Sequence, residues 1–203
     1  VHEFYTPPNV RILLVDELND YLWSCSANTI TLWNLNTRGK IKEFNGHANS
    51  VYGLCKVDNN IFVSSSNDLS LKIWNIKTGK CVRSIEYAHS KNILAILYCA
   101  RNKVLVTASD DNTVKVWDLK IKATKNYVYR CTLKFTIINP NDQSCCSLAF
   151  LDGENDGSRV LVGDDSGSML VVDLNNGTFV NKSKKVHAYA IWKLAHGNVM
   201  GKM

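Results

Sequence analysis

Two sets of histidine, serine, aspartate and tryptophan residues recur in the sequence with nearly the same spacing. The first set is His47, Ser66, Asp68 and Trp74, and the second is His89, Ser109, Asp111 and Trp117. Histidine, serine and aspartate are the residue types of a hydrolase triad, in which histidine activates the serine hydroxyl and aspartate orients the histidine. The same types can also form a buried hydrogen-bond chain, because imidazole and hydroxyl groups both donate and accept while indole only donates. The elements that hold these residues decide between the two roles.

A repeated strand pattern surrounds both sets. Four segments align, each with a short turn, an alternating strand, an aromatic or aliphatic residue and then Asn or Asp: CSANTITLWN, SNDLSLKIWN, SDDNTVKVWD and DDSGSMLVVD. The anchors Trp33, Trp74 and Trp117 recur at intervals of 41 and 43 residues, and Val172 follows after 55. An insertion around KIKATKNYVYR explains the longer interval. The alternation predicts short strands separated by Asn, Asp and Gly turns.

A second marker repeats in step with the anchors. The pairs Gly46-His47, Ala88-His89 and Val186-His187 each come four residues before a β-branched residue, namely Val51, Ile93 and Ile191. Two short apolar runs lie between a marker and its Trp, and a turn with one more short strand follows the Trp. The sequence therefore predicts about four strands in each repeat of ~42 residues.

This Gly-His to Trp-Asp period resembles the WD-repeat family, whose members fold as β-propellers with four antiparallel strands per blade. The resemblance covers nearly the whole chain. It implies an all-β WD-repeat propeller with about three full blades, a degenerate fourth and the start of a fifth. We expect blades at about residues 10–45, 46–87, 88–141 and 143–185, with an incomplete fifth unit at 187–203. Because family propellers usually have more blades than this, we expect these residues to be part of a larger chain.

The resemblance also implies a structural role for the two sets of polar residues. In the family, the turn Asp accepts from His, the His bonds the Ser hydroxyl, and the Ser accepts from the Trp indole. Blades one and four depart from this pattern, because Ala27 and Cys25 stand at the Asp and Ser positions of blade one, and Ser166 and Val172 at the Asp and Trp positions of blade four. We expect apolar packing to hold these two blades instead.

Partner-binding positions follow from the same resemblance, because three positions per blade face the loops at one end of the propeller. They are Ser50, Tyr52 and Asn67 in blade two, Asn92, Leu94 and Asp110 in blade three, and Ala190 and Trp192 in the fifth unit. Strand alignment alone adds Asn9, Arg11, Ser26, Ser144, Cys146 and Asp165. Independently, alternation turns Tyr52 and Trp192 away from the packed Val51 and Ile191. With Arg11, these aromatics are the residue types that dominate binding hot spots.

Composition sets the broad class. Of 203 residues, 45% are hydrophobic and 21% are charged, which is typical of a soluble globular chain. The net charge of +6 is spread out, and its densest stretches, Lys120–Lys125 and Lys182–Lys185, are interpreted as solvated loops, with an acidic partner as the alternative. Seven cysteines without a CxxC pair indicate reduced thiols in a cytoplasmic protein, the nucleus not being excluded, with neither zinc nor disulfides.

No motif of a catalyst is present, since the sequence lacks a P-loop, a dinucleotide-binding turn, HExxH and GxSxG. We therefore expect a non-enzymatic scaffold without metal or cofactor that binds a protein or peptide through one face of the propeller. Nucleic acid and a small-molecule substrate are not expected, and membrane binding is disfavoured because an FRRG motif is absent. Two alternatives stay open: a substrate-recognition propeller of a ubiquitin ligase adaptor, which the terse blades resemble, and a regulatory domain of a larger signalling enzyme.

Overall fold

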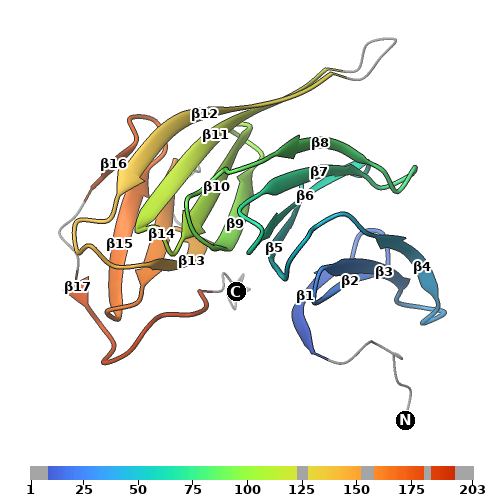
Figure 1. Ribbon diagram of the computed structural model, residues 1–203, viewed down its shortest axis with the longest axis horizontal. Helices are drawn as coiled ribbons and strands as arrows, with labels where there is room; N and C mark the ends of the chain where they lie inside the picture. The colour runs from blue at the N-terminus through green and yellow to red at the C-terminus, as the bar shows by residue number, and fades with distance from the viewer. Residues whose placement is uncertain (1–8, 123–127, 152–157, 181–183, 195–203) are drawn as a thin grey trace, which may run out of the picture.

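Antiparallel strands make up the regular secondary structure in the computed structural model, which describes residues 9–122, 128–151, 158–180 and 184–194. The strands form four sheets, each built from strands that follow one another in the chain (Figure 1). The predicted all-β class with four-stranded antiparallel sheets is therefore confirmed. Within the described ranges, no helix is long and apolar enough to cross a membrane.

The sheets follow the sequence repeat. The first contains β1 (Val10–Asp16), β2 (Tyr21–Ser26), β3 (Thr29–Asn34) and β4 (Lys40–Phe44). The second contains β5 (Val51–Lys56), β6 (Ile61–Ser66), β7 (Leu71–Asn75) and β8 (Cys81–Ile85). The third contains β9 (Ile93–Cys99), β10 (Val104–Ser109), β11 (Thr113–Lys122) and β12 (Val128–Ile138). The fourth contains β13 (Cys145–Phe150), β14 (Arg159–Asp164), β15 (Ser168–Asp173) and β16 (Thr178–Phe179), and β17 (Lys184–Lys185) also pairs with β15. Each sheet lies inside one of the first four expected blade ranges.

The sheets are arranged as an arc, with their first strands on its concave side (Figure 1). Neighbouring inner strands contact each other: β1 contacts β5, β5 contacts β9, and β9 contacts β13. All residues of β6 and β10 are buried, because neighbouring sheets cover both faces of these middle strands. The inner strand β5 instead alternates between buried and half-buried residues, since only every second side chain points into the packed interface.

Three apolar clusters fill the spaces between neighbouring sheets. The cluster between the first two sheets is aromatic, with Trp23 4.6 Å and Phe44 4.8 Å from the ring of Phe62 (centroid to centroid). The ring of Trp74 stacks on Phe62 at an interplanar angle of 9°. The other two clusters are mainly aliphatic. Close packing of sheet on sheet therefore defines the arc, and each sheet depends on its neighbours for burial.

The turn between the second and third strands of a sheet docks onto the chain that leads to the next sheet. Residues with a positive φ angle lie at this point in all four sheets: Ala27 (48°), Leu69 (68°), Asn112 (63°) and Gly167 (84°). Their carbonyl groups accept backbone hydrogen bonds from Val51, Ala88, Asn139 and Val186, at 2.9, 2.8, 2.8 and 3.0 Å. The left-handed conformation turns the carbonyl group towards the next sheet, and Asn and Gly adopt it at low cost.

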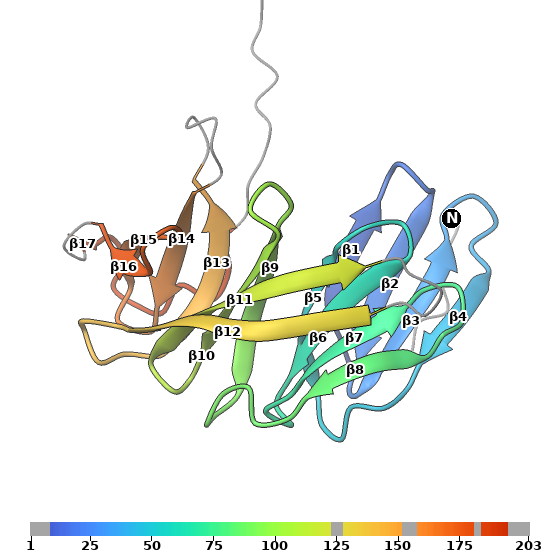
Figure 2. The ribbon, with the colours of Figure 1, turned by 90° about the horizontal axis from the view of Figure 1, so that it is seen from above.

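The insertion predicted around KIKATKNYVYR lengthens one hairpin. Strands β11 and β12 have 10 and 11 residues, against 5 or 6 in the corresponding strands of the first two sheets. The long hairpin crosses the outer side of the second sheet (Figures 1 and 2). Its Leu119 and Cys131 are buried in the cluster between the second and third sheets. The hairpin therefore extends this interface beyond the blade, and its tip, residues 123–127, lies outside the described residues.

A short segment opens the predicted fifth unit. The backbone N–H of Ile191 donates to the carbonyl of Asp164 at 3.1 Å, and the Ser147 hydroxyl donates to the carbonyl of Ile191 at 2.6 Å. Ile191 packs against Gly163, where a Cβ atom would come within 2.7 Å of it. The segment thus packs against the face of the fourth sheet that points away from the third sheet. The rest of the expected unit, residues 195–203, lies outside the described residues.

Gly53 provides a test of the close approach between inner strands. A Cβ atom built on Gly53 would lie 2.3 Å from the Ser65 hydroxyl and 2.7 Å from the Cγ2 of Ile96 in the next sheet. We expect Gly53→Ala to lower the free energy of unfolding by about 1–3 kcal/mol through overpacking. Gly39→Ala is the matched control, because Gly39 lies in an exposed turn with its nearest neighbour at 3.4 Å. Equal denaturant midpoints for both variants would contradict this packing.

Candidate functional site

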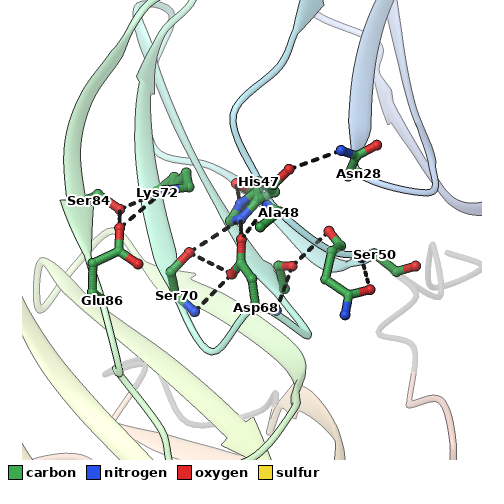
Figure 3. Close-up of polar contacts among 12 residues, drawn as sticks. Asn28, His47, Ala48, Ser50, Asp68, Ser70, Lys72, Ser84 and Glu86 are labelled. Atoms are coloured by element: carbon green, nitrogen blue, oxygen red, sulfur yellow. Dashed lines mark hydrogen bonds and ion pairs between the residues drawn. The ribbon is translucent and has the colours of Figure 1, made fainter.

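The second sheet contains a continuous hydrogen-bond chain, of which Figure 3 shows His47, Asp68 and Ser70. The buried imidazole of His47 lies 2.7 Å from Asp68 Oδ2 through Nδ1 and 2.7 Å from Ser64 Oγ through Nε2. The indole N–H of Trp74 donates to the same Ser64 oxygen at 2.8 Å. Ser70 adds a hydroxyl that donates to Asp68 Oδ1 at 2.6 Å. This hydrogen-bond chain connects the loop before β5 with strands β6 and β7 and with the turn between them.

The third sheet repeats this arrangement. His89 lies 2.9 Å from Asp111 Oδ2 and 2.7 Å from the Thr107 hydroxyl. The indole N–H of Trp117 donates to Thr107 at 3.0 Å. The Thr113 hydroxyl donates to Asp111 Oδ1 at 2.6 Å, as Ser70 does in the second sheet. Two adjacent sheets are therefore held by the same four-part network.

The prediction that Ser66 and Ser109 provide the network hydroxyls was wrong. Ser64 and Thr107 fill the place expected for Ser66 and Ser109, two residues earlier on the same face of the strand. Phe62 is paired with Trp74 across the two strands, so the indole reaches diagonally to the next residue on that face, which is Ser64. Ser66 lies one step farther along, at the end of the strand.

Ser66 and Ser109 stabilise the turn that follows each strand. The Ser66 hydroxyl accepts from the backbone N–H of Asp68 at 3.0 Å and donates to the carbonyl of Asn49 at 2.9 Å. The Ser109 hydroxyl accepts in the same way from Asp111 at 3.1 Å. These short-range bonds fix the backbone of the turn. They place each Asp carboxylate against its histidine.

Both network histidines are held neutral. Burial lowers the pKa of His47 and of His89, and it outweighs the opposing effect of the hydrogen bonds from each imidazole to Asp68 and Asp111. The neutral tautomer with a proton on Nδ1 satisfies every group: Nδ1–H donates to the carboxylate, and Nε2 accepts from a hydroxyl that itself accepts from the indole. A second proton on Nε2 would end the hydrogen bond that this nitrogen accepts from the Ser64 or Thr107 hydroxyl.

The carboxylates stay charged. Burial alone would raise the pKa of Asp68, but hydrogen bonds from Ser70, His47 and the backbone of Ala48 hold it below its ordinary value. The same balance lowers the pKa of Asp111, where burial is outweighed by hydrogen bonds from His89, Thr113 and the backbone of Ser90. Each Asp is therefore an anionic acceptor for several donors.

These residues cannot act as hydrolytic triads. Ser64 and Thr107 are completely buried, and each hydroxyl is already bonded to a histidine and to an indole N–H. A nucleophile must reach a substrate carbonyl, and no substrate can approach these oxygens. Among the described residues, no group of three or more His, Cys, Asp or Glu residues could hold a metal ion.

The first sheet keeps part of the network, contrary to the expectation of purely apolar packing. The indole of Trp33 donates to Ser24 at 2.8 Å, so the hydroxyl is Ser24 rather than Cys25, which is buried in an apolar cluster. The turn between β2 and β3 has only two residues, Ala27 and Asn28, and is shorter than the corresponding turns of the second and third sheets. Asn28 instead donates to the carbonyl of His47 at 3.0 Å and so links the first two sheets.

The fourth sheet also has a polar centre, and the expectation of purely apolar packing was wrong there too. Asp164 occupies the strand-end position of Ser66 and accepts from the hydroxyl of Ser166 at 2.6 Å. The side-chain amides of Asn139 and Asn141 donate to its other oxygen at 3.3 and 2.8 Å. Asn139 and Asn141 precede the inner strand, as His47 does in the second sheet. A carboxylate with two amides thus replaces the histidine chain.

The predicted partner-binding positions on the inner strands come together in one cavity. Its volume is about 450 Å³, and it lies along the inner strands of all four sheets and the start of the fifth unit. Four of the predicted residues line it: Arg11, Tyr52, Leu94 and Trp192. Cys146, which strand alignment suggested, lines it as well. The guanidinium of Arg11 lies 5.1 Å from the centre of the Tyr52 ring, in cation–π contact. Trp192 is 68% exposed.

The other predicted positions lie in the loops at one end of the inner strands. The backbone N–H groups of Asn67, Asp110 and Asp165 donate to the carbonyls of Ser50, Asn92 and Ser144, each at 3.0 Å. Since each acceptor immediately precedes an inner strand, these turn residues lie next to the point where that strand begins. Asn92 also donates from its side chain to Asp110 at 3.0 Å. In the described part of the chain, the buried Oδ1 of Asn67 has no hydrogen-bond donor.

The structure adds lining residues that the sequence prediction missed. Leu13, Leu54 and Lys193 face the same cavity, deeper along the inner strands or beside Trp192. The missed signal was the alternation itself, since it continues along each strand beyond the one position assigned at its start. The cavity is therefore mainly apolar below a polar and aromatic end.

Sequence comparisons fit this geometry. The profile described as WD domain, G-beta repeat matches residues 38–75 and 79–118, which end directly after Trp74 and at the Asp that follows Trp117. These two segments are WD repeats. The first contains the outer strand β4 of the first sheet and the strands β5, β6 and β7 of the second sheet, so each matched repeat spans parts of two of the sheets described above.

Relatives of this WD-repeat chain match short parts of it. F-box/WD repeat-containing protein 10 of Mus musculus is 47% identical over 55 residues, which is 27% of this chain and 5% of that protein. The "Probable E3 ubiquitin ligase complex SCF subunit scon-2" of Neurospora crassa is 40% identical over 63 residues, which is 31% of this chain and 9% of that protein. The chain thus spans less than a tenth of the length of these two relatives.

A solved structure shows the same fold. The β-propeller domain of Cps50 (Swd1) from Myceliophteria thermophila has a TM-score of 0.71 with this WD-repeat chain at 14% sequence identity. The match covers 92% of this chain and 59% of that domain. At this identity the likeness establishes the propeller fold alone.

Replacing Ser64 tests the network in the second sheet. We expect Ser64→Ala to lower the free energy of unfolding by about 2–4 kcal/mol, because the buried groups of His47 and Trp74 both lose a partner. Ser65→Ala is a matched control, since Ser65 is equally buried and its hydroxyl has no hydrogen-bond partner in the described residues. Chemical denaturation should find Ser65→Ala at least as stable as the wild type. Equal losses for both variants would rule out Ser64 as the junction.

The buried histidines predict a particular pH dependence. Since the folded pKa values of His47 and His89 lie below the ordinary 6.5, the unfolded chain takes up protons first as the pH falls. The free energy of unfolding should therefore decrease below about pH 6.5, by at most about 1.4 kcal/mol per pH unit for each histidine. A second decrease should begin below about pH 3.8, where the unfolded aspartates protonate before Asp68 and Asp111.

Thermal unfolding between pH 8 and pH 5 measures the first effect. His187→Gln, a change at an exposed position, should leave the pH dependence unchanged. A stability that stays constant from pH 7 to pH 5 would mean that the network histidines are not buried in neutral form.

Proposed function

We propose that this chain is a non-catalytic binding module that holds a protein or peptide partner at the cavity along its inner strands. WD-repeat propellers in general act as scaffolds for protein interactions, and the proposal assigns that role to one particular surface here. The single observation that carries it is the convergence of Arg11, Tyr52, Leu94 and Trp192, contributed by four different sheets or units, on one cavity of about 450 Å³.

The chemistry of this cavity suits a peptide segment. Apolar side chains line most of its length, and the polar groups are gathered at one end. The exposed indole of Trp192 and the stacked Arg11–Tyr52 pair offer flat surfaces of the type that forms binding hot spots. Arg11 and Tyr52 lie on the paired strands β1 and β5, so little ordering of these two residues is required on binding.

Alanine substitutions test this proposal. We expect Tyr52→Ala and Trp192→Ala each to remove the same set of proteins from a crosslinking pull-down analysed by mass spectrometry. Leu18→Ala is the control, because Leu18 is 94% exposed in the turn between β1 and β2, at the opposite end of the inner strands. A pull-down that is unchanged by both aromatic substitutions would exclude this surface as the binding site.

A second candidate role is substrate recognition within a ubiquitin ligase. The names of two relatives favour it, one an F-box/WD repeat-containing protein and the other a subunit of an E3 ubiquitin ligase complex. In that case, proteins that bind the cavity would be ubiquitinated in cells and would accumulate when the full-length protein carries Trp192→Ala. Stable levels of the captured proteins, with no ubiquitin on them, would leave only the scaffold role. We also propose that the protein resides in a reducing compartment such as the cytoplasm, where its seven cysteines would stay reduced.

A further inference from the structure

The charges around the proposed binding cavity are unevenly distributed. Asp110 and Asp165 occupy equivalent turn positions in the third and fourth sheets, each bonded through its backbone N–H to the residue before an inner strand. Leu94 and Cys146, which line the cavity, are the second residues of those same strands. The two carboxylates therefore lie at the end of the cavity, beside its third and fourth sheets.

Both carboxylates are available to a ligand. Asp165 is exposed, and Asp110 accepts a hydrogen bond from the neutral amide of Asn92. In the described residues neither forms an ion pair, whereas Asp16 and Glu86 are paired with Lys56 and Lys72. An unpaired carboxylate beside an apolar cavity attracts a cationic group, because partial desolvation strengthens the interaction.

The thiol of Cys146 reports the sign of the local field. Its pKa is raised to about 12, first by burial and then by the negative charges of Asp165, Asp110 and Asp164. Asp164 already accepts hydrogen bonds from Asn141, Ser166 and the backbone of Ser168. The potential at this part of the cavity is therefore negative, and Asp110 and Asp165 are the groups that a ligand could neutralise.

Two cations line the same cavity, and in the described residues neither forms an ion pair with Asp110 or Asp165. Arg11 belongs to the first sheet and lies over the ring of Tyr52. Lys193 belongs to the fifth unit and follows Trp192.

From this arrangement we infer that the cavity recognises a lysine or arginine side chain of the partner. Its cationic head would lie between Asp110 and Asp165, and its methylene stem would lie against Leu94 and the exposed indole of Trp192. Such side chains have an apolar stem and a charged tip, which matches the apolar wall and polar end of the cavity. The indole adds a cation–π surface. The inference rests on the proposed function and specifies the chemistry of the partner.

Four synthetic peptides test this inference with the full chain. They are capped at both ends and identical except for a central Lys, Arg, Gln or Glu flanked by small neutral residues, and they carry a fluorescent label for anisotropy. We expect the Lys and Arg peptides to bind at least about tenfold more tightly than the Gln and Glu peptides. Higher salt should reduce this preference. Binding should also change the fluorescence of Trp192, because the other four tryptophans are buried.

Charge-neutralising variants locate the preference. Asp110→Asn and Asp165→Asn should each weaken the Lys and Arg peptides by about tenfold and leave the Gln peptide unchanged. Asp20→Asn is the control, since Asp20 is an exposed carboxylate in the turn between β1 and β2 and its positive φ angle of 54° suits Asn. Unchanged unfolding temperatures for all three variants would show that folding is intact.

The outcomes separate this inference from the proposed function. Peptides that bind without preference for charge, or that bind equally to both Asn variants while Trp192→Ala abolishes anisotropy, would overturn the inference and leave the cavity as a binding site. Failure of the Lys and Arg peptides to bind even at millimolar concentration would also overturn it. The pull-down with Tyr52→Ala and Trp192→Ala would then decide the proposed function alone.

Discussion

A single buried oxygen joins four parts of the chain in the second sheet. Ser64 Oγ accepts from the indole of Trp74 on one strand and donates to His47 in the loop before the sheet, and that histidine binds Asp68 in the turn. In a region of low dielectric, an unmade bond of this kind costs more than a made bond contributes. The network therefore acts mainly by excluding other arrangements of the strands. Apolar packing between sheets supplies the larger part of the stability, and the buried polar groups fix its geometry.

The same constraint is met differently along the arc. The third sheet repeats it with Thr107, the first keeps only the bond between Trp33 and Ser24, and the fourth uses Asp164 with two asparagine amides. What stays constant is a buried oxygen acceptor that ties the strands of a sheet to one another or to the loop before them. This requirement also positions the candidate site, because the turn that presents Asp68 or Asp111 to a histidine presents the preceding residue, Asn67 or Asp110, at the end of the cavity. A rigid network thus lies directly behind the residues proposed to meet a partner.

Much of this architecture could be predicted from the sequence, because the strand alternation and the spacing of His, Asp and Trp repeat over whole blades. The cavity positions Arg11, Tyr52, Leu94 and Trp192 followed from the side of the inner strand on which they fall. The network hydroxyl could not be chosen in the same way. Ser64, Ser65 and Ser66 are consecutive, and only the diagonal approach of the Trp74 indole distinguishes Ser64 from Ser66 on the same face. Spacing to the tryptophan does not help, because Ser66 and Ser109 both precede it by eight residues just as Ser64 and Thr107 both precede it by ten. The polar centre of the fourth sheet could not be found from the repeat either, since Asp164 performs its role from a strand end and its partners come from a different segment.

The protonation of the two network histidines is the most direct test of this account. Long-range ¹H–¹⁵N correlation spectra report the tautomer and charge of each imidazole in solution. We expect His47 and His89 to be neutral, to carry their proton on Nδ1, and to keep this form below the pH at which an exposed histidine becomes charged. A proton on Nε2 at neutral pH, or titration of either ring at an ordinary pKa, would contradict a buried hydrogen-bond chain as the element that fixes these sheets.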